Sequence, residues 1–89
     1  MAASEALVRK RPALPLGKVL RAAREELGLT QEDVAQRACV TRQLLTALES
    51  GRRQPSMTLL PYLGMALELR ASELLHRAEI LQQERKGQV

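Results

Sequence analysis

Aromatic side chains are almost absent from this chain of 89 residues, which has no Phe, no Trp and a single tyrosine, Tyr62. Leu, Ala and Val must therefore supply the buried surface. Small aliphatic side chains suit closely packed helices better than a sheet sandwich, which draws on aromatic and β-branched residues. The composition predicts an all-α bundle, and the length allows one domain with a modest core.

Cysteine and long apolar runs are also scarce. The single cysteine, Cys39, cannot form a disulfide within the chain, and no segment approaches the ~20 apolar residues of a membrane-spanning helix. In the first residues, MAASEALVRKRP, the basic side chains follow the apolar ones, which is the reverse of the order in a secretory signal. We therefore expect a cytoplasmic protein that does not enter a membrane.

Residues suited to catalysis or metal binding are few. His76 is the only histidine, and we interpret it as a surface residue. No Ser-His-Asp arrangement, glycine-rich phosphate loop or pair of catalytic carboxylates can be assembled from this sequence. We therefore expect no enzymatic activity, no bound metal and no cofactor.

Positive charge is concentrated in the first two thirds of the chain. The net charge is +4: residues 1–56 contain ten Lys or Arg against six Asp or Glu, and residues 57–89 contain four of each. Phosphate neutralisation by Lys and Arg supplies most of the sequence-independent affinity of proteins for DNA. The distribution favours a polyanion partner for the first part, although ordinary solubilising charge would give the same excess.

Apolar spacing predicts five helices with short connections. Their expected ranges are about Leu16–Leu27, Gln31–Ala38, Arg42–Ser50, Met57–Leu67 and Ala71–Gln83. The inner positions of the first three are Leu16, Val19, Leu20, Ala23 and Leu27, then Val34, Ala35 and Ala38, then Leu45 and Leu48. We expect residues 16–83 to form the domain, residues 1–15 an extended basic arm, and residues 84–89 a disordered tail.

Capping residues set the expected helix ends. Thr30 and Asp33 form an aspartate variant of the capping box, and Thr41 caps the next helix. Gly51 ends that helix as a C′ glycine. Ser56 is the expected cap of the fourth helix, but Pro61 lacks an N–H that this helix needs, so we expect a kink or a start delayed to Leu60.

Short motifs follow one another in a specific order over residues 16–75. They are Leu20-Arg21-x-x-Arg24, Gly28-Leu29-Thr30-Gln31, Val34-Ala35, Leu48-Glu49-x-Gly51 and Pro55-Ser56. In this order and spacing they resemble the helix-turn-helix of the Cro and phage-repressor (Xre-like) family. The resemblance implies a five-helix lambda-repressor-like DNA-binding bundle, in which residues 42–50 form the recognition helix that enters the major groove.

Two positions depart from that family pattern. Cys39 stands where the family usually has a glycine in the turn, so a left-handed backbone there would be modestly strained. Leu44 stands at a position of the recognition helix that is usually polar and exposed. It either packs on a thymine methyl group or belongs to a different interface.

The resemblance implies which residues contact DNA. Arg42 and Gln43 open the recognition helix, where arginine can bind guanine and glutamine can pair with adenine through two hydrogen bonds each. Thr46 and Ala47 are expected on the same exposed arc, within reach of a base or a phosphate. Phosphate contacts are expected from Gln31, Thr41, Arg52 and Arg53, and from the arm residues Arg9, Lys10 and Arg11 if they follow the groove.

Two further sets of residues are expected to support the interface. The resemblance implies a salt bridge between Arg24 and Glu49, which joins the first helix to the end of the recognition helix. The last helix has two apolar stripes, so one should face the bundle and the other a second copy. The expected dimer interface consists of Leu74, Leu75, Ala78 and Leu81.

These expectations describe a small regulator that binds double-stranded DNA as a homodimer on a palindromic operator and represses by covering a promoter. Two other functions stay open. The chain could be an antitoxin that holds a toxin through its last helix or Leu44, or a protein-interaction module that keeps the fold without binding DNA.

Overall fold

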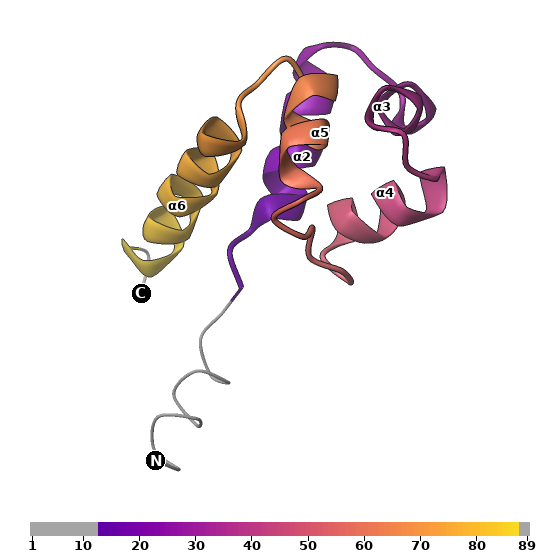
Figure 1. The fold of residues 1–89 in the computed structure, drawn as a ribbon. Coiled ribbons are helices and arrows are strands. Elements are labelled where there is room, and N and C mark those ends of the chain that lie inside the picture. Colours follow the sequence, from indigo (N-terminus) through magenta and orange to yellow (C-terminus); the bar gives the residue numbers. More distant parts are fainter. Residues whose placement is uncertain (1–12, 88–89) are drawn as a thin grey trace.

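Five α-helices and no strand make up residues 13–87, the part of the chain that the computed structural model describes. They are labelled in Figure 1 and comprise α2 (Leu16–Glu26), α3 (Gln31–Ala38), α4 (Arg42–Ser50), α5 (Leu60–Ala66) and α6 (Ala71–Gly87). The all-α prediction is therefore confirmed. Within this range no helix combines the length and the apolar character that crossing a membrane requires.

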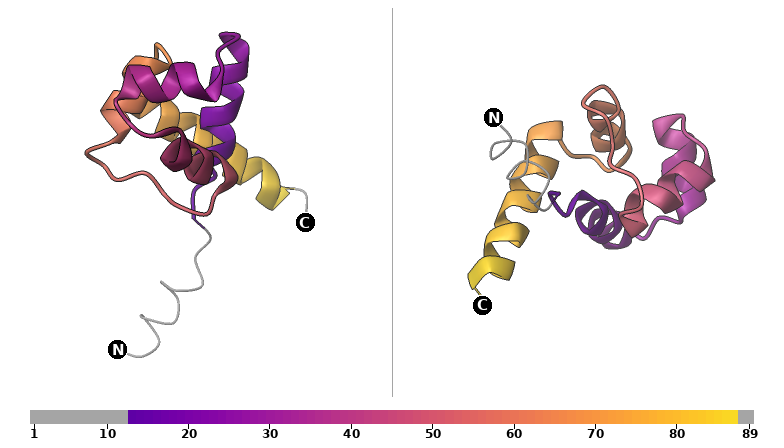
Figure 2. Two further views of the ribbon diagram at one scale, coloured as in Figure 1. Left: turned by 90° about the vertical axis from the view of Figure 1, so that its right-hand side faces the viewer. Right: turned by 90° about the horizontal axis from the view of Figure 1, so that it is seen from below.

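The helix α2 holds the two ends of the bundle together. It contacts α4 and α6, while α5 contacts α3 and α6. Seen from below in Figure 2, α3 and α4 lie at one end of the molecule, α6 lies at the other, and α2 and α5 lie between them. The pair formed by α3 and α4 therefore has an outer surface that no other described helix covers.

The core is aliphatic, as the composition predicts. Its fully buried large side chains are Leu20, Val34, Leu45, Leu48, Leu60, Leu63 and Leu74. Tyr62 lies outside this core with 53% of its surface exposed. Leu27, expected on the inner stripe of the first helix, is 40% exposed, because α2 ends at Glu26 and the chain turns away there.

Two of the four residues expected at a dimer interface on the last helix are not on its surface. Leu74 and Ala78 are fully buried in the bundle, where α6 packs against α2 and α5. Leu75 and Leu81 are partly buried against the same core. Leu74 and Ala78 are thus covered within one chain, whereas Leu75 and Leu81 keep part of their surface exposed, so a dimer interface on this helix stays a prediction. The helix also continues to Gly87, beyond its expected end at Gln83.

Capping hydrogen bonds and left-handed turn residues set the ends of α3 and α4, as the sequence predicts. The Thr30 hydroxyl accepts a hydrogen bond from the N–H of Asp33 at 3.1 Å, and the Asp33 carboxylate accepts one from the N–H of Thr30 at 2.9 Å. The hydrogen bond from the Thr30 N–H to the carboxylate, followed by the interaction of the carboxylate with the Thr30 side chain, holds the pKa of Asp33 below its ordinary value of 3.8. The turn between α3 and α4 passes through Cys39 at φ 58°, in the left-handed region, and Gly51 ends α4 at φ 83°.

The proline delays α5 to Leu60, one of the two outcomes that the sequence allows. Pro61 then lies in the first turn of the helix, where its missing N–H breaks no helical hydrogen bond. The Ser56 hydroxyl accepts from the N–H of Leu59 at 3.1 Å and so caps the turn that precedes α5 rather than a helix starting at Met57.

One glycine controls how closely α2 approaches α4. A Cβ atom on Gly17 would overlap the carbonyl oxygen of Leu48 and would lie 2.8 Å from the carbonyl oxygen of Glu49. Only a residue without a side chain allows this contact between two backbones. Gly17 therefore sets the distance between α2 and the last turn of α4.

We expect Gly17→Ala to lower the free energy of unfolding by about 3 kcal/mol, since the backbone of α4 must move to admit the methyl group. Lys18→Ala, at the exposed neighbouring position, is the matched control and should change stability by less than about 0.5 kcal/mol. Urea denaturation of the three proteins measures both effects. A more stable Gly17→Ala protein, as in an open helix, would show that the two backbones are not in contact.

Candidate nucleic-acid interface

The exposed arc of α4 begins at the first turn of the helix. Arg42 and Gln43 are exposed, and Thr46 and Ser50 follow Arg42 at intervals of four residues, which places these three on one side. Leu45 and Leu48 lie on the opposite side and anchor α4 in the core. The residues expected to read bases thus lie on an outer surface of the bundle.

Ala47 does not belong to that arc. It is only 8% exposed, because the chain turns back after Gly51 and the N–H of Arg53 donates to the Ala47 carbonyl at 3.2 Å. The prediction of a base contact at Ala47 is therefore wrong. Ser50 lies on the arc instead, and its hydroxyl accepts a hydrogen bond from Arg52 Nε at 3.3 Å.

Leu44 is half-buried rather than exposed beside the DNA-reading arc. It packs against the core and lines an apolar groove together with Val40, Leu59 and Tyr62. The groove lies on the flank of α4 that faces α5. Of the two expectations for Leu44, the structure favours an interface other than the base contacts.

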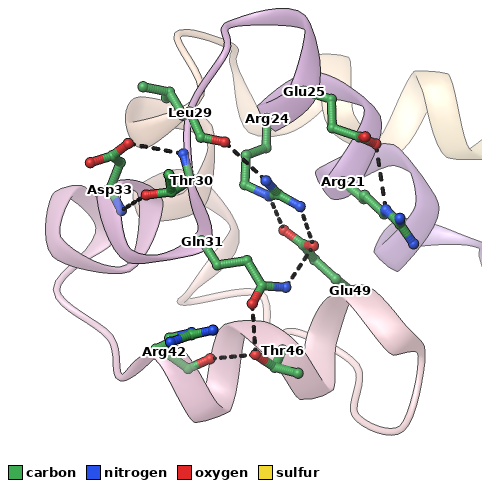
Figure 3. Close-up of polar contacts among 10 residues, drawn as sticks. All are labelled: Arg21, Arg24, Glu25, Leu29, Thr30, Gln31, Asp33, Arg42, Thr46 and Glu49. Carbon is green, nitrogen blue, oxygen red and sulfur yellow. Dashed lines mark hydrogen bonds and ion pairs between the residues drawn. The ribbon is translucent and has the colours of Figure 1, made fainter.

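A bidentate ion pair fixes α4 to α2 (Figure 3). Arg24 Nε lies 2.8 Å from Glu49 Oε2, and Arg24 Nη2 lies 3.1 Å from Glu49 Oε1. The third nitrogen, Nη1, donates to the Leu29 carbonyl at 2.9 Å. The side chains are 14% and 5% exposed, and the hydrogen bonds to Glu49 raise the pKa of Arg24. The pair that the resemblance implies is thus present and largely shielded from water.

Gln31 extends this network to the exposed arc. Its Nε2 donates to Glu49 Oε1 at 3.1 Å, and its Oε1 lies 3.0 Å from the hydroxyl of Thr46. That hydroxyl also lies 2.9 Å from the Arg42 carbonyl, and its single proton can serve only one acceptor at a time. The second N–H of the Gln31 amide is not used by this network. Gln31 therefore braces α4 and keeps a donor for a ligand.

Several cations surround the arc without a buried partner. Arg42 and Arg53 form no ion pair with a carboxylate of the described residues, and the only ion pair of Arg21 there, to Glu25 at 3.4 Å, is exposed. Arg21 also lines a cleft with Gln31, Thr46 and Ser50. Sequence reasoning missed Arg21 and Ser50. Both follow from helical spacing, since Arg21 precedes Arg24 by one turn and Ser50 follows Thr46 by one turn.

Of the remaining residues expected to contact DNA, the structure describes Thr41 but not the three arm residues. Thr41 is exposed, and its hydroxyl oxygen accepts a hydrogen bond from the N–H of Leu44 at 3.0 Å, which leaves its proton free to donate. Arg9, Lys10 and Arg11 lie outside the described residues.

Within residues 13–87 there is no group of three or more His, Cys, Asp or Glu side chains that could hold a metal ion.

Comparisons with known proteins agree with this geometry. A family model described as helix-turn-helix matches residues 20–69. A relative from Methanothermobacter thermautotrophicus, named an uncharacterized HTH-type transcriptional regulator, is 51% identical over 49 residues, which are 55% of this chain and 71% of the relative.

Two solved structures are similar over most of their length. The clp gene regulator ClgR from Corynebacterium glutamicum has a TM-score of 0.81 and 30% identity, with 86% of this chain and 84% of that chain covered. The restriction-modification controller protein C.AhdI from Aeromonas hydrophila has a TM-score of 0.65 and 31% identity, with 68% and 92% covered. The first of these proteins is a regulator of clp genes, and the second is a controller protein of a restriction-modification system.

We expect Glu49→Gln to lower the free energy of unfolding by about 3 kcal/mol, because Arg24 would remain largely buried without its counter-charge. Glu25→Gln is the matched control, because it breaks the exposed pair between Arg21 and Glu25 within α2. Its expected loss in the free energy of unfolding is below about 0.5 kcal/mol. The loss in the double mutant Arg24→Gln, Glu49→Gln should be smaller than the sum of the single losses. Additive losses in denaturant titrations would mean that the two side chains are not coupled.

Proposed function

This chain belongs to the Xre/Cro-type helix-turn-helix family of transcriptional regulators, and on that premise we propose that it is a sequence-specific DNA-binding repressor that acts as a homodimer on a palindromic operator. The observation that carries the proposal is the braced α4. The network of Arg24, Glu49 and Gln31 fixes a helix whose exposed arc starts with Arg42 and Gln43. A rigid helix with these side chains at its outer end suits the major groove.

In this proposal the side chains that contact bases belong mainly to the first turn of α4. Arg42 can donate two hydrogen bonds to O6 and N7 of a guanine, and Gln43 can pair with N6 and N7 of an adenine. Thr46 has a methyl group that can contact a thymine, while its hydroxyl stays in the Gln31 network. The half-site should therefore contain adjacent guanine and adenine contacts.

Phosphate binding surrounds these base contacts. Arg52 and Arg53 follow α4 directly, and Arg52 is oriented by its hydrogen bond to Ser50. The Thr41 hydroxyl and the unused N–H of Gln31 add neutral donors at the other end of the helix pair. Such contacts position a protein on the duplex without reading its sequence. Arg21 joins them by exchanging its exposed contact with Glu25 for a phosphate.

Repression by occlusion needs nothing beyond tight, specific binding. A dimer with two-fold symmetry would place its recognition helices about one turn of DNA, roughly 34 Å, apart, so the operator should be a palindrome with that half-site spacing. Covering a promoter in this way requires neither catalysis nor a cofactor. In this proposal the protein acts in the cytoplasm, where it has access to DNA.

We expect Arg42→Ala and Gln43→Ala to weaken binding to an operator selected from random duplexes by roughly 1–3 kcal/mol each and to leave binding to unrelated DNA almost unchanged. Arg53→Ala should weaken binding to both kinds of duplex. It should also reduce, by about 1, the slope of the logarithm of the binding constant against the logarithm of the salt concentration. Arg85→Ala, which removes an exposed arginine from α6, controls for the loss of one charge.

Fluorescence anisotropy titrations at several salt concentrations separate these cases. Equal losses on selected and unrelated duplexes for Arg42→Ala would remove its role in base recognition. If no duplex is bound in a salt-dependent manner by the unmodified protein, the proposed function is wrong, and the fold serves protein interaction instead.

A further inference from the structure

The apolar groove beside Leu44, which we call the Leu44 groove, has the size of a small-molecule site. Its volume is about 490 Å³, within the range of roughly 300–1,000 Å³ that ligand pockets span. Its apolar walls come from three segments: Val40 in the turn after α3, Leu44 on the flank of α4, and Leu59 and Tyr62 at the start of α5. These side chains lie beside the arc of α4 that is expected to contact bases, and none of them belongs to it.

The polar side chains of the groove come from one short segment. Arg53, Gln54, Ser56 and Thr58 lie between α4 and α5, and all four are exposed. The Ser56 hydroxyl oxygen accepts a hydrogen bond from the N–H of Leu59, which leaves its proton free to donate. The groove therefore combines apolar walls with a few polar groups along one edge, an arrangement typical of sites for small amphiphilic molecules.

The charge of the groove indicates which molecule it suits. Within residues 13–87, Arg53 is the only charged side chain that lines it, no Asp or Glu does, and Arg53 forms no ion pair with a carboxylate. A guanidinium binds a carboxylate through two parallel hydrogen bonds. One positive charge matches a monoanion better than a doubly charged phosphate. The groove is thus complementary to a carboxylate that carries an apolar tail.

Another apolar groove, between α2 and α6, is less suited to an anion. Val19 and Ile80 contribute apolar walls there, but Glu26 and Glu84 also line it. Its Arg77 already lies 3.5 Å from Glu26. A carboxylate ligand in that groove would meet two negative charges and would compete with Glu26 for the arginine.

We propose that the Leu44 groove binds a monocarboxylate with an unbranched alkyl tail, a compound of the medium-chain fatty acid class. The carboxylate pairs with Arg53 at the polar edge, and the tail lies along Leu44, Leu59 and Tyr62. Burial of the tail supplies most of the affinity, and the charged hydrogen bonds set the orientation. This role also accounts for a leucine at position 44, where the family usually has a polar residue.

Occupancy of the groove is coupled to DNA binding through Arg53. This step rests on the proposed function, in which Arg53 contacts a DNA phosphate, whereas binding of the carboxylate to the free protein does not. A guanidinium that holds a ligand carboxylate is lost to the phosphate, and the ligand brings a negative charge close to α4. The ligand and the duplex therefore weaken each other's binding by the same factor, which we expect to be about tenfold.

Titration of the free protein with octanoate, decanoate and octanol tests the site. Tyr62 is the only aromatic residue and lines the groove, so its fluorescence reports occupancy. Decanoate should bind about tenfold more tightly than octanoate, because two more methylene groups are buried. Octanol, which lacks the charge, should bind at least about tenfold more weakly than octanoate. Saturating decanoate should also slow the alkylation by iodoacetamide of Cys39, the only cysteine, which lines the same groove.

Two arginine variants locate the carboxylate. Arg53→Gln should weaken decanoate binding at least about tenfold. Arg52→Gln is the matched control, because Arg52 is the exposed neighbour but does not line the groove, and it should bind decanoate like the unmodified protein. Equal losses in the two variants would reduce the effect to general electrostatic attraction and would overturn the site. A loss in Arg77→Gln alone would place the ligand between α2 and α6 and would overturn it as well.

Thermal melting separates binding from a detergent effect. A ligand that binds the native state raises the melting temperature, so decanoate should raise that of the unmodified protein and should change that of Arg53→Gln much less. A lowered melting temperature would mean that decanoate acts as a detergent. That result, or the absence of any change in Tyr62 fluorescence at millimolar decanoate, would overturn the proposal.

Competition on DNA distinguishes failure of this proposal from failure of the proposed function. Saturating decanoate should weaken binding of the unmodified protein to a selected duplex about tenfold and should leave the affinity of Arg53→Gln almost unchanged. Equal weakening of both proteins would overturn Arg53 as the shared residue. Decanoate binding to a protein that binds no duplex would refute only the DNA-binding function.

Discussion

The ion pair between Arg24 and Glu49 is the interaction on which the rest of the interface depends. It crosses from α2 to the last turn of α4, and its carboxylate also receives the amide of Gln31 at the start of α3. Three helices therefore meet at one carboxylate. Because the two side chains are largely buried, water cannot easily replace either partner. Gly17 makes this arrangement possible, since it lets the backbones of α2 and α4 come close enough for the pair to form. The angle at which Arg42 and Gln43 face a duplex is thus controlled by residues that do not touch it.

Local features of the helices were predictable because they depend on neighbouring residues. The capping box at Thr30, the cap at Thr41 and the left-handed Gly51 each act within one turn of chain, and the structure has all three. Pro61 restricted the start of α5 in the same way. The partner of Arg24 is different, because it lies 25 residues away in sequence and no periodicity connects the two. Only the resemblance to a known family indicated that pair, and the structure supplies what the resemblance did not, namely the shared contact with Gln31.

The errors arose where distant segments decide exposure. Ala47 looked exposed by its place on a helix, but the chain that follows α4 returns over it. Leu74 and Ala78 looked like surplus apolar surface, but α2 and α5 together cover them. On α5, for which the sequence predicted no inner face, Tyr62 and Met65 are exposed. Helical spacing identifies an apolar side of a helix, whereas the number of neighbours that cover it is settled by tertiary packing.

The central claim is that α4, braced by the buried pair, enters the groove of DNA while α6 does not. The most direct test is the change in backbone amide NMR shifts on titration with a duplex selected from random sequences. The account predicts the largest changes at Gln31, at residues 41–43 and at residues 50–53, with α6 almost unchanged beyond its first turn. Changes confined to α6, with the amides of α4 unaffected at saturating duplex, would contradict it.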